Sequence, residues 1–150
     1  MAGFVTADQV RVGVEVSSRE EALRYLADLG VECGFATDAD ALYAAFLARE
    51  AEGETGLTDG FATPHAKSAA ITTAGITFVK FTSTLDWPSF DKGPVDIALA
   101  LYVPDGEAGT THLRLLSKAA VMLMKAPNRE KLRACDDPEE LAAFISAGLA

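Results

Sequence analysis

The sequence predicts an α/β protein, a three-layer α/β/α sandwich around a mixed sheet. Apolar residues recur first with a two-residue period and then with helical periods along the chain. The segment Val95–Val103 is nearly all apolar, as expected of a central strand that helices cover on both faces. Of the 150 residues, 49% are hydrophobic and 23% are charged, which fits a globular protein of this class.

The first half of the chain predicts one strand and two helices. Valines alternate with other residues from Val10 to Val16, the pattern of a half-buried strand. Ser18 and Glu21 have the spacing of a capping box, so we expect a helix there, ended by Gly30. A second helix is expected to be capped by Thr37 or Asp38 and to end within residues 48–53.

The second half predicts two strands and three helices. The strands are expected within residues 71–84 and at 95–103, separated by a turn in which Trp87 and Phe90 would close the edge of the core. We expect a helix capped by Thr110 or Thr111 that runs to about Lys125. Two closing helices follow at 128–134 and 138–149, the last capped by Asp137.

Size and charge restrict the classes of function. Residues 1–150 fit one domain. The net charge is −9, with no basic tract, which argues against nucleic acid and anionic membranes as partners. No apolar run is long enough to cross a bilayer, and no signal peptide is evident, so we expect a cytoplasmic protein without membrane insertion. Cys33 and Cys135 lack the spacing of zinc ligands.

The stretch 56–68 is the strongest candidate for chemistry. Gly56 and Gly60 allow a turn, and Pro64 restricts the backbone just before His65. A neutral imidazole held in this way is a nucleophile, and Lys67 could attract an anion to it. Taken alone, the same residues also suit a turn with a capping histidine.

Two other residues could contribute charge or hydrogen bonds. Arg49 lies in the last turn of the second predicted helix, although pairing with Glu50 or Glu52 would explain it equally well. His112 falls in the first turn of a later helix, where backbone amides favour an anion and a neutral imidazole. A histidine in that position can also be simply solvated.

Taken together, these residues resemble a known family, the fructose/mannitol-type enzyme IIA domain of the bacterial sugar phosphotransferase system. The resemblance covers nearly the whole chain. It rests on the order and spacing of the following residues: Arg49-Glu50, Thr55-Gly56-Leu57, the run from Gly60 to Ser68 (GFATPHAKS), Trp87, Asp91, Pro94-Val95, His112-Leu113 and Leu116.

The resemblance implies a phosphocarrier. No cofactor is expected, and no metal, since the acidic cluster that magnesium prefers is missing around His65. Such a domain accepts a phosphoryl group from HPr or an HPr-like domain and passes it to a cysteine of a sugar-specific enzyme IIB, in the uptake of fructose or a related sugar. His65 matches the phosphorylated histidine, and Arg49 and His112 match the residues that flank it. Asp59 stands where the family often has a small residue, and we expect its carboxylate to face solvent.

Several alternatives remain open from the sequence. A regulatory, nitrogen-type enzyme IIA would share the fold and act through phosphorylation-dependent protein binding. A histidine-dependent hydrolase or phosphatase could use His65 with Asp59 or Asp91, although no GxSxG motif or metal cluster accompanies them. A purely structural module would need Arg49 and His112 to lie far from His65. The absence of a Walker motif argues against a nucleotide donor.

Overall fold

A computed structural model describes residues 5–106 and 110–149, with the backbone alone at residues 110–113 and 115. Within these residues a five-stranded sheet has the order β1-β4-β5-β2, and β3 also pairs with β5. β4 runs antiparallel to β5, and the other pairs are parallel, so the sheet is mixed as predicted. The elements are η1 (Ala7–Gln9), β1 (Val10–Val14), α1 (Arg19–Glu32), α2 (Ala39–Glu52), β2 (Phe61–Ala62), β3 (His65–Ser68), β4 (Gly75–Leu85), β5 (Val95–Pro104), α3 (Thr110–Met124), α4 (Ala126–Ala134) and α5 (Pro138–Leu149).

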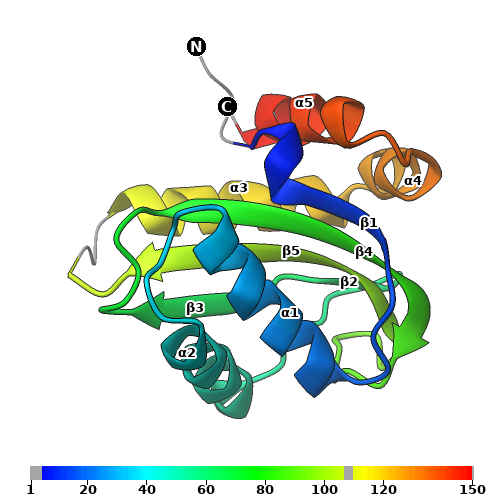
Figure 1. Ribbon diagram of the computed structural model, residues 1–150. Helices are drawn as coiled ribbons and strands as arrows, with labels where there is room; N and C mark the ends of the chain where they lie inside the picture. Colours follow the sequence, from blue (N-terminus) through cyan, green and yellow to red (C-terminus); the bar gives the residue numbers. More distant parts are fainter. Residues whose placement is uncertain (1–4, 107–109, 150) are drawn as a thin grey trace.

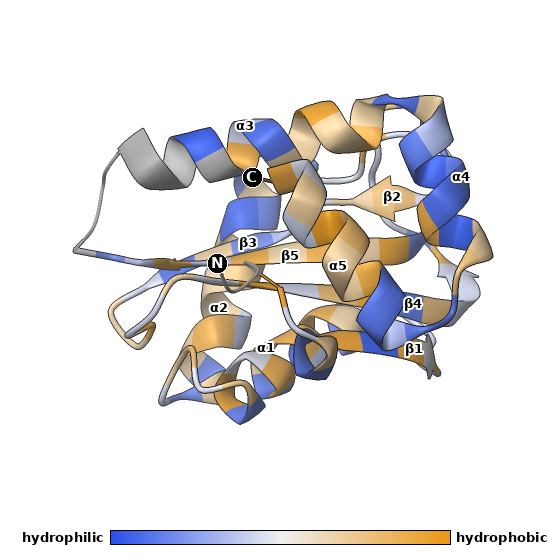
Figure 2. Cartoon of the chain, turned by 90° about the horizontal axis from the view of Figure 1, so that it is seen from above, coloured by the Kyte–Doolittle hydropathy of each residue, from blue (hydrophilic) through white to orange (hydrophobic). Residues whose placement is uncertain are grey.

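The helices cover both faces of the sheet, which confirms the predicted three layers. Helices α1 and α2 lie against one face, and α3, α4 and α5 lie against the other (Figure 1). Seen from above, the sheet is a band of mostly hydrophobic colour between the two helical layers (Figure 2). Each face therefore has its own apolar core.

Strand β5 contributes to both cores. Its larger side chains, such as Leu99, pack toward α3 and α5. The alternate residues Ala98 and Ala100 face α1 and α2, where small side chains leave room for Tyr102. All of these residues are buried, as the apolar run at 95–103 predicted.

The predicted alternation in the first strand is interrupted by a bulge. Val10 is opposite Phe78 and Val14 is opposite Phe81, so the first strand has one residue more than its partner between these pairs. Gly13 takes a left-handed φ of 68° there. As a result Val10 packs in the core under α5 and Val14 in the core under α1, so the prediction of one buried face from Val10 to Val16 was wrong.

The helix ends were predicted except at Gly30 and at the start of α4, which begins at Ala126 and not at Asn128. Ser18 and Asp38 accept backbone hydrogen bonds as the N-caps of α1 and α2. Gly30, however, does not end α1, which continues to Glu32, and Gly34 follows with a φ of 84°. Gly30 is instead a site of close packing, since a Cβ there would lie 2.5 Å from a ring carbon of Tyr102.

Three smaller expectations have mixed outcomes. Trp87 is buried as predicted, but Phe90 is 77% exposed and does not close the core. Asp137 accepts a hydrogen bond from the Glu139 amide at the start of α5, as a cap should. Helix α3 begins at Thr110 itself, so the residue before it, the cap position, lies outside the described residues.

Across residues 5–106 and 110–149, none of the helices combines the length and the apolar character that a membrane crossing requires.

We predict that Gly30→Ala lowers the free energy of unfolding by about 1–3 kcal/mol, the usual cost of overpacking, although alanine favours helices. The new methyl group would collide with Tyr102, whose hydroxyl is fixed by bonds to Thr77 and the Leu26 carbonyl. Urea denaturation measures the effect. Gly148→Ala in α5 is the matched control, because its Cβ would meet only the flexible Met122 side chain. Equal stability of both variants with the parent protein would contradict the packing role of Gly30.

Candidate functional site

His65 is the first residue of β3 and is held by parallel pairing to β5. It lies opposite Leu101, whose amide donates to the Pro64 carbonyl at 2.9 Å. Neighbouring residues in register point to the same face of a sheet. Because Leu101 packs in the core under α3 and α5, the half-buried His65 side chain lies on that face, and the exposed Lys67 follows it there two residues later.

The ring of His65 is oriented by a hydrogen bond to its own strand. Nδ1 lies 2.5 Å from the carbonyl oxygen of Thr63. A carbonyl can only accept, so Nδ1 carries the proton and Nε2 keeps its lone pair. The imidazole therefore presents Nε2 as its nucleophilic atom.

The surroundings favour the neutral form of this imidazole. Burial lowers the pKa of His65 below the ordinary 6.5, and the positive charge of Arg49 lowers it further. The hydrogen bonds with the backbone of Thr63 and Pro64 and the charge of Glu52 oppose this shift without reversing it. At neutral pH the ring is thus ready to act as a nucleophile.

Arg49 lies in the last turn of α2, close enough for its charge to act on His65. Its Nη1 donates to the Gly53 carbonyl at 2.8 Å, which holds the guanidinium at the end of the helix. In the described part of the chain it forms no ion pair with Glu50 or Glu52, the alternative that the sequence left open. The guanidinium retains further N–H groups that could bind an anion.

His112 is in the first turn of α3, the helix that follows β5. Its side chain lies outside the described part of the structure. The backbone places this turn on the face of the sheet to which His65 belongs.

Asp59 lies in the loop between α2 and β2, and Asp91, in the turn between β4 and β5, holds that loop by hydrogen bonds. Asp59 is exposed, as predicted, and its carboxylate contacts Arg129 of α4 at 3.3 Å. Asp91 accepts from the amides of Gly93 and Asp59, and these bonds lower the pKa of Asp91 to about 2. This loop joins the sheet at Phe61, which is opposite Ile97, whereas His65 is opposite Leu101 further along β5. Neither carboxylate orients His65, whose Nδ1 is taken by a carbonyl, as a hydrolase using them would require.

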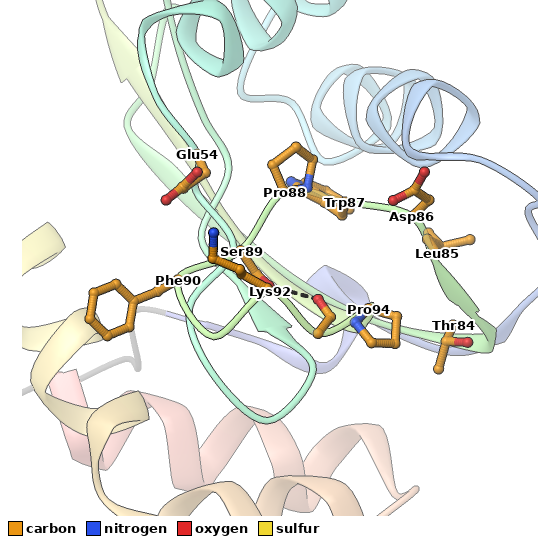
Figure 3. Close-up of a pocket in the computed structure, with 11 residues that line it drawn as sticks. Glu54, Thr84, Leu85, Asp86, Trp87, Pro88, Ser89, Phe90, Lys92 and Pro94 are labelled. Carbon is orange, nitrogen blue, oxygen red and sulfur yellow. Dashed lines mark hydrogen bonds between the residues drawn. The ribbon is translucent and has the colours of Figure 1, made fainter.

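A cavity of about 570 Å³ opens beside this loop, lined mainly by the turn between β4 and β5. Figure 3 shows Phe90 pointing away from the other lining residues, and a hydrogen bond of 2.6 Å from Ser89 to the Gly93 carbonyl that closes the turn. The buried Trp87 lies in the same turn, at the inner side of the loop. Glu54, in the link after α2, also lines the cavity.

The sequence analysis considered Glu50 only as a possible ion-pair partner of Arg49 and as part of the family pattern, and missed that its carboxylate is buried beside the candidate site. It is only 9% exposed, and its carboxylate bonds to Trp87 and Thr55. A signal was present, because Glu50 follows Phe46 by four residues and Leu42 by eight, on the buried stripe of α2.

No metal centre is formed by the residues that the structure describes, since nowhere among them do three histidine, cysteine, aspartate or glutamate side chains gather as ligands.

Comparisons with known proteins find relatives over most of this chain. Residues 3–148 match the family model described as phosphoenolpyruvate-dependent sugar phosphotransferase system, EIIA 2. A PTS system fructose-specific EIIA component of Haloferax volcanii is 34% identical over 116 residues, which are 77% of this chain and 75% of that protein. The 2-O-alpha-mannosyl-D-glycerate-specific EIIABC component of Escherichia coli is 32% identical over 92% of this chain, which spans only 21% of that longer protein.

A solved structure has a similar fold over nearly the whole chain. The nitrogen regulatory protein IIA-Ntr of Neisseria meningitidis superposes with a TM-score of 0.87 at 27% identity, covering 95% of this chain and 96% of that one. This chain is therefore similar both to a relative with a sugar-specific name and to a solved structure with a nitrogen regulatory name. Because the family model spans almost the whole chain, the protein belongs to the EIIA 2 family of the phosphoenolpyruvate-dependent sugar phosphotransferase system, whose members are phosphotransfer components.

Proposed function

We propose that this protein is a phosphocarrier in which Nε2 of His65 accepts a phosphoryl group from the phosphohistidine of HPr or an HPr-like domain. In that step the nitrogen–phosphorus bond of the donor breaks as the Nε2–phosphorus bond forms. In a second step the Nε2–phosphorus bond breaks as the thiolate of a cysteine of a sugar-specific enzyme IIB forms a sulfur–phosphorus bond. The observation that carries the proposal is the Nδ1 hydrogen bond to Thr63, which leaves Nε2 free.

Arg49 and His112 are proposed to bind the transferred group. Phosphoryl transfer asks mainly for alignment and for neutralisation of the equatorial oxygens. Arg49 supplies a permanent positive charge near His65. Its guanidinium bonds to the Gly53 carbonyl and forms no ion pair with the neighbouring Glu50 or Glu52. The position of His112 at the start of α3 supports a role for its imidazole as a hydrogen-bond donor to the phosphoryl oxygens.

The sugar-specific branch is supported by the fructose-specific relative from Haloferax, and we propose fructose or a related sugar. The likeness to the Neisseria IIA-Ntr structure favours a second candidate, a regulatory enzyme IIA. Both roles use the same phosphohistidine. Incubating the phosphorylated protein with a panel of purified enzyme IIB domains separates them. Transfer to a IIB cysteine supports transport, whereas no transfer together with phosphorylation-dependent capture of a regulator supports the second role.

We expect His65→Gln to abolish phosphorylation by phosphoenolpyruvate in the presence of enzyme I and HPr, because the amide has no nucleophilic lone pair. Intact-mass spectrometry should show one added phosphoryl group on the parent protein and none on the variant. Asp59→Asn is the matched control and should be labelled normally, because that carboxylate contacts Arg129 rather than the ring. A labelled His65→Gln protein would refute the assignment.

Arg49→Ala should keep the fold and slow phosphoryl acceptance by roughly 10²- to 10³-fold, as the loss of transition-state charge stabilisation usually does. Quench-flow measurement of labelling gives the rate. Arg49→Lys should recover part of it, because lysine restores the charge but not the planar fork. If Arg49→Ala accepts phosphate at the parental rate, the arginine does not act on the phosphoryl group.

The pH dependence of phosphoryl acceptance follows from the lowered pKa of His65. Only the neutral ring is a nucleophile, and its pKa lies below 6.5, so the midpoint of the loss of acceptance on acidification should lie below pH 6.5. The ring resonances of His65 followed by NMR should titrate with a midpoint below 6.5. Arg49→Ala should move that midpoint upward, since it removes a nearby positive charge. A midpoint above 6.5 in the parent protein would contradict the burial of the ring.

A further inference from the structure

Glu50 is a buried carboxylate with both oxygens engaged. It lies next to Arg49 in the last turn of α2 and is 9% exposed. The Thr55 hydroxyl donates to Oε2, and the indole Nε1 of Trp87 donates to Oε1 at 3.2 Å. Because Thr55 and Trp87 both donate to this one side chain, Glu50 joins the link that follows α2 to the turn between β4 and β5.

Two further hydrogen bonds connect Thr55 to His65. The Thr55 carbonyl accepts from the Thr63 amide at 2.9 Å, and the Thr63 carbonyl accepts from Nδ1 of His65. Thr55 is 2% and Thr63 5% exposed, so little water competes for these bonds. A continuous path of hydrogen bonds therefore runs from Trp87 through Glu50, Thr55 and Thr63 to the imidazole.

Building on the proposed function, we infer that Glu50 is a positioning residue for phosphoryl acceptance. By holding Thr55 it fixes the Thr63 carbonyl, which keeps the proton on Nδ1 and leaves Nε2 available. The carboxylate does not touch the ring or the phosphoryl group. It acts through the backbone of residues 55 and 63.

Packing alone gives no reason for a charge at this position. Glu50 continues the buried stripe of Leu42 and Phe46, where an apolar side chain would cost less to bury. An apolar residue would fill the space but could not hold the Thr55 hydroxyl or the indole N–H in a fixed direction. The buried carboxylate therefore lowers the stability of the fold relative to an apolar side chain, but its hydrogen bonds restrain the segment that carries His65.

The test uses two isosteric variants at equally buried threonines. Thr55→Val removes the donor to Glu50, whereas Thr77→Val removes a core hydrogen bond to Tyr102 that is not connected to His65. Nitrogen-15 NMR of the unphosphorylated full-length protein at neutral pH measures the ratio of the Nδ1–H to the Nε2–H tautomer of His65. Phosphoryl acceptance from HPr is measured on the same samples.

We expect Thr55→Val to lower the tautomer ratio and the acceptance rate by about three- to tenfold, the equivalent of one hydrogen bond. Thr77→Val should lower only the stability, and Thr55→Ser, which keeps the hydroxyl, should behave as the parent protein. If Thr55→Val changes stability alone, as Thr77→Val does, the inference is overturned.

If Thr55→Val does not fold, the inference is tested by the tautomer ratio of His65 in Glu50→Gln. Its amide oxygen can take the donor-only indole, which turns the NH₂ group toward the Thr55 hydroxyl and weakens that restraint. A lower tautomer ratio in the folded variant supports the inference, and an unchanged ratio overturns it. Because the tautomer is read without phosphate, this result is independent of whether His65 is phosphorylated, and so it is distinguishable from a failure of the proposed function.

Discussion

The hydrogen bond between Nδ1 of His65 and the Thr63 carbonyl determines what the site can do. A neutral imidazole without a fixed hydrogen-bond partner populates two tautomers, and either nitrogen can then carry the free lone pair. Here a carbonyl acceptor selects one tautomer, and burial lowers the pKa so that the ring stays neutral. The chemistry therefore depends on how firmly the backbone at Thr63 is held.

Two parts of the fold hold that backbone. On one side, β3 pairs in parallel with β5, the strand that both cores bury. On the other, the amide of Thr63 bonds to Thr55, whose side chain bonds to Glu50 at the end of α2. Arg49 and Glu50 both lie at the end of α2. This helix end therefore places a positive charge near the ring of His65 and also holds the segment that leads into β3.

Much of this arrangement was predictable because it depends on local rules. The caps at Ser18 and Asp38 follow from side chains that satisfy free amides at helix starts, and the buried strand at 95–103 follows from its composition. The errors occurred where a distant residue decides the outcome. Gly30 resembles a helix end but lies inside α1, because the ring of Tyr102 occupies the space that a side chain would need.

The sequence by itself determined the helices, the strands β1, β4 and β5, the two-sided burial of the sheet and the choice of His65, Arg49 and His112 as candidates, since periodicity, caps and family spacing are properties of the sequence alone. It did not predict β2 and β3, because both are short strands in a stretch with the composition of a turn, so His65 was expected in a turn and not at the start of a strand. Only the tertiary structure decided which nitrogen of His65 is free, the bulge at Gly13 and the use of Glu50 as an anchor. These depend on contacts between segments far apart in the chain, such as Glu50 with Trp87, and on hydrogen-bond directions that only the folded backbone sets.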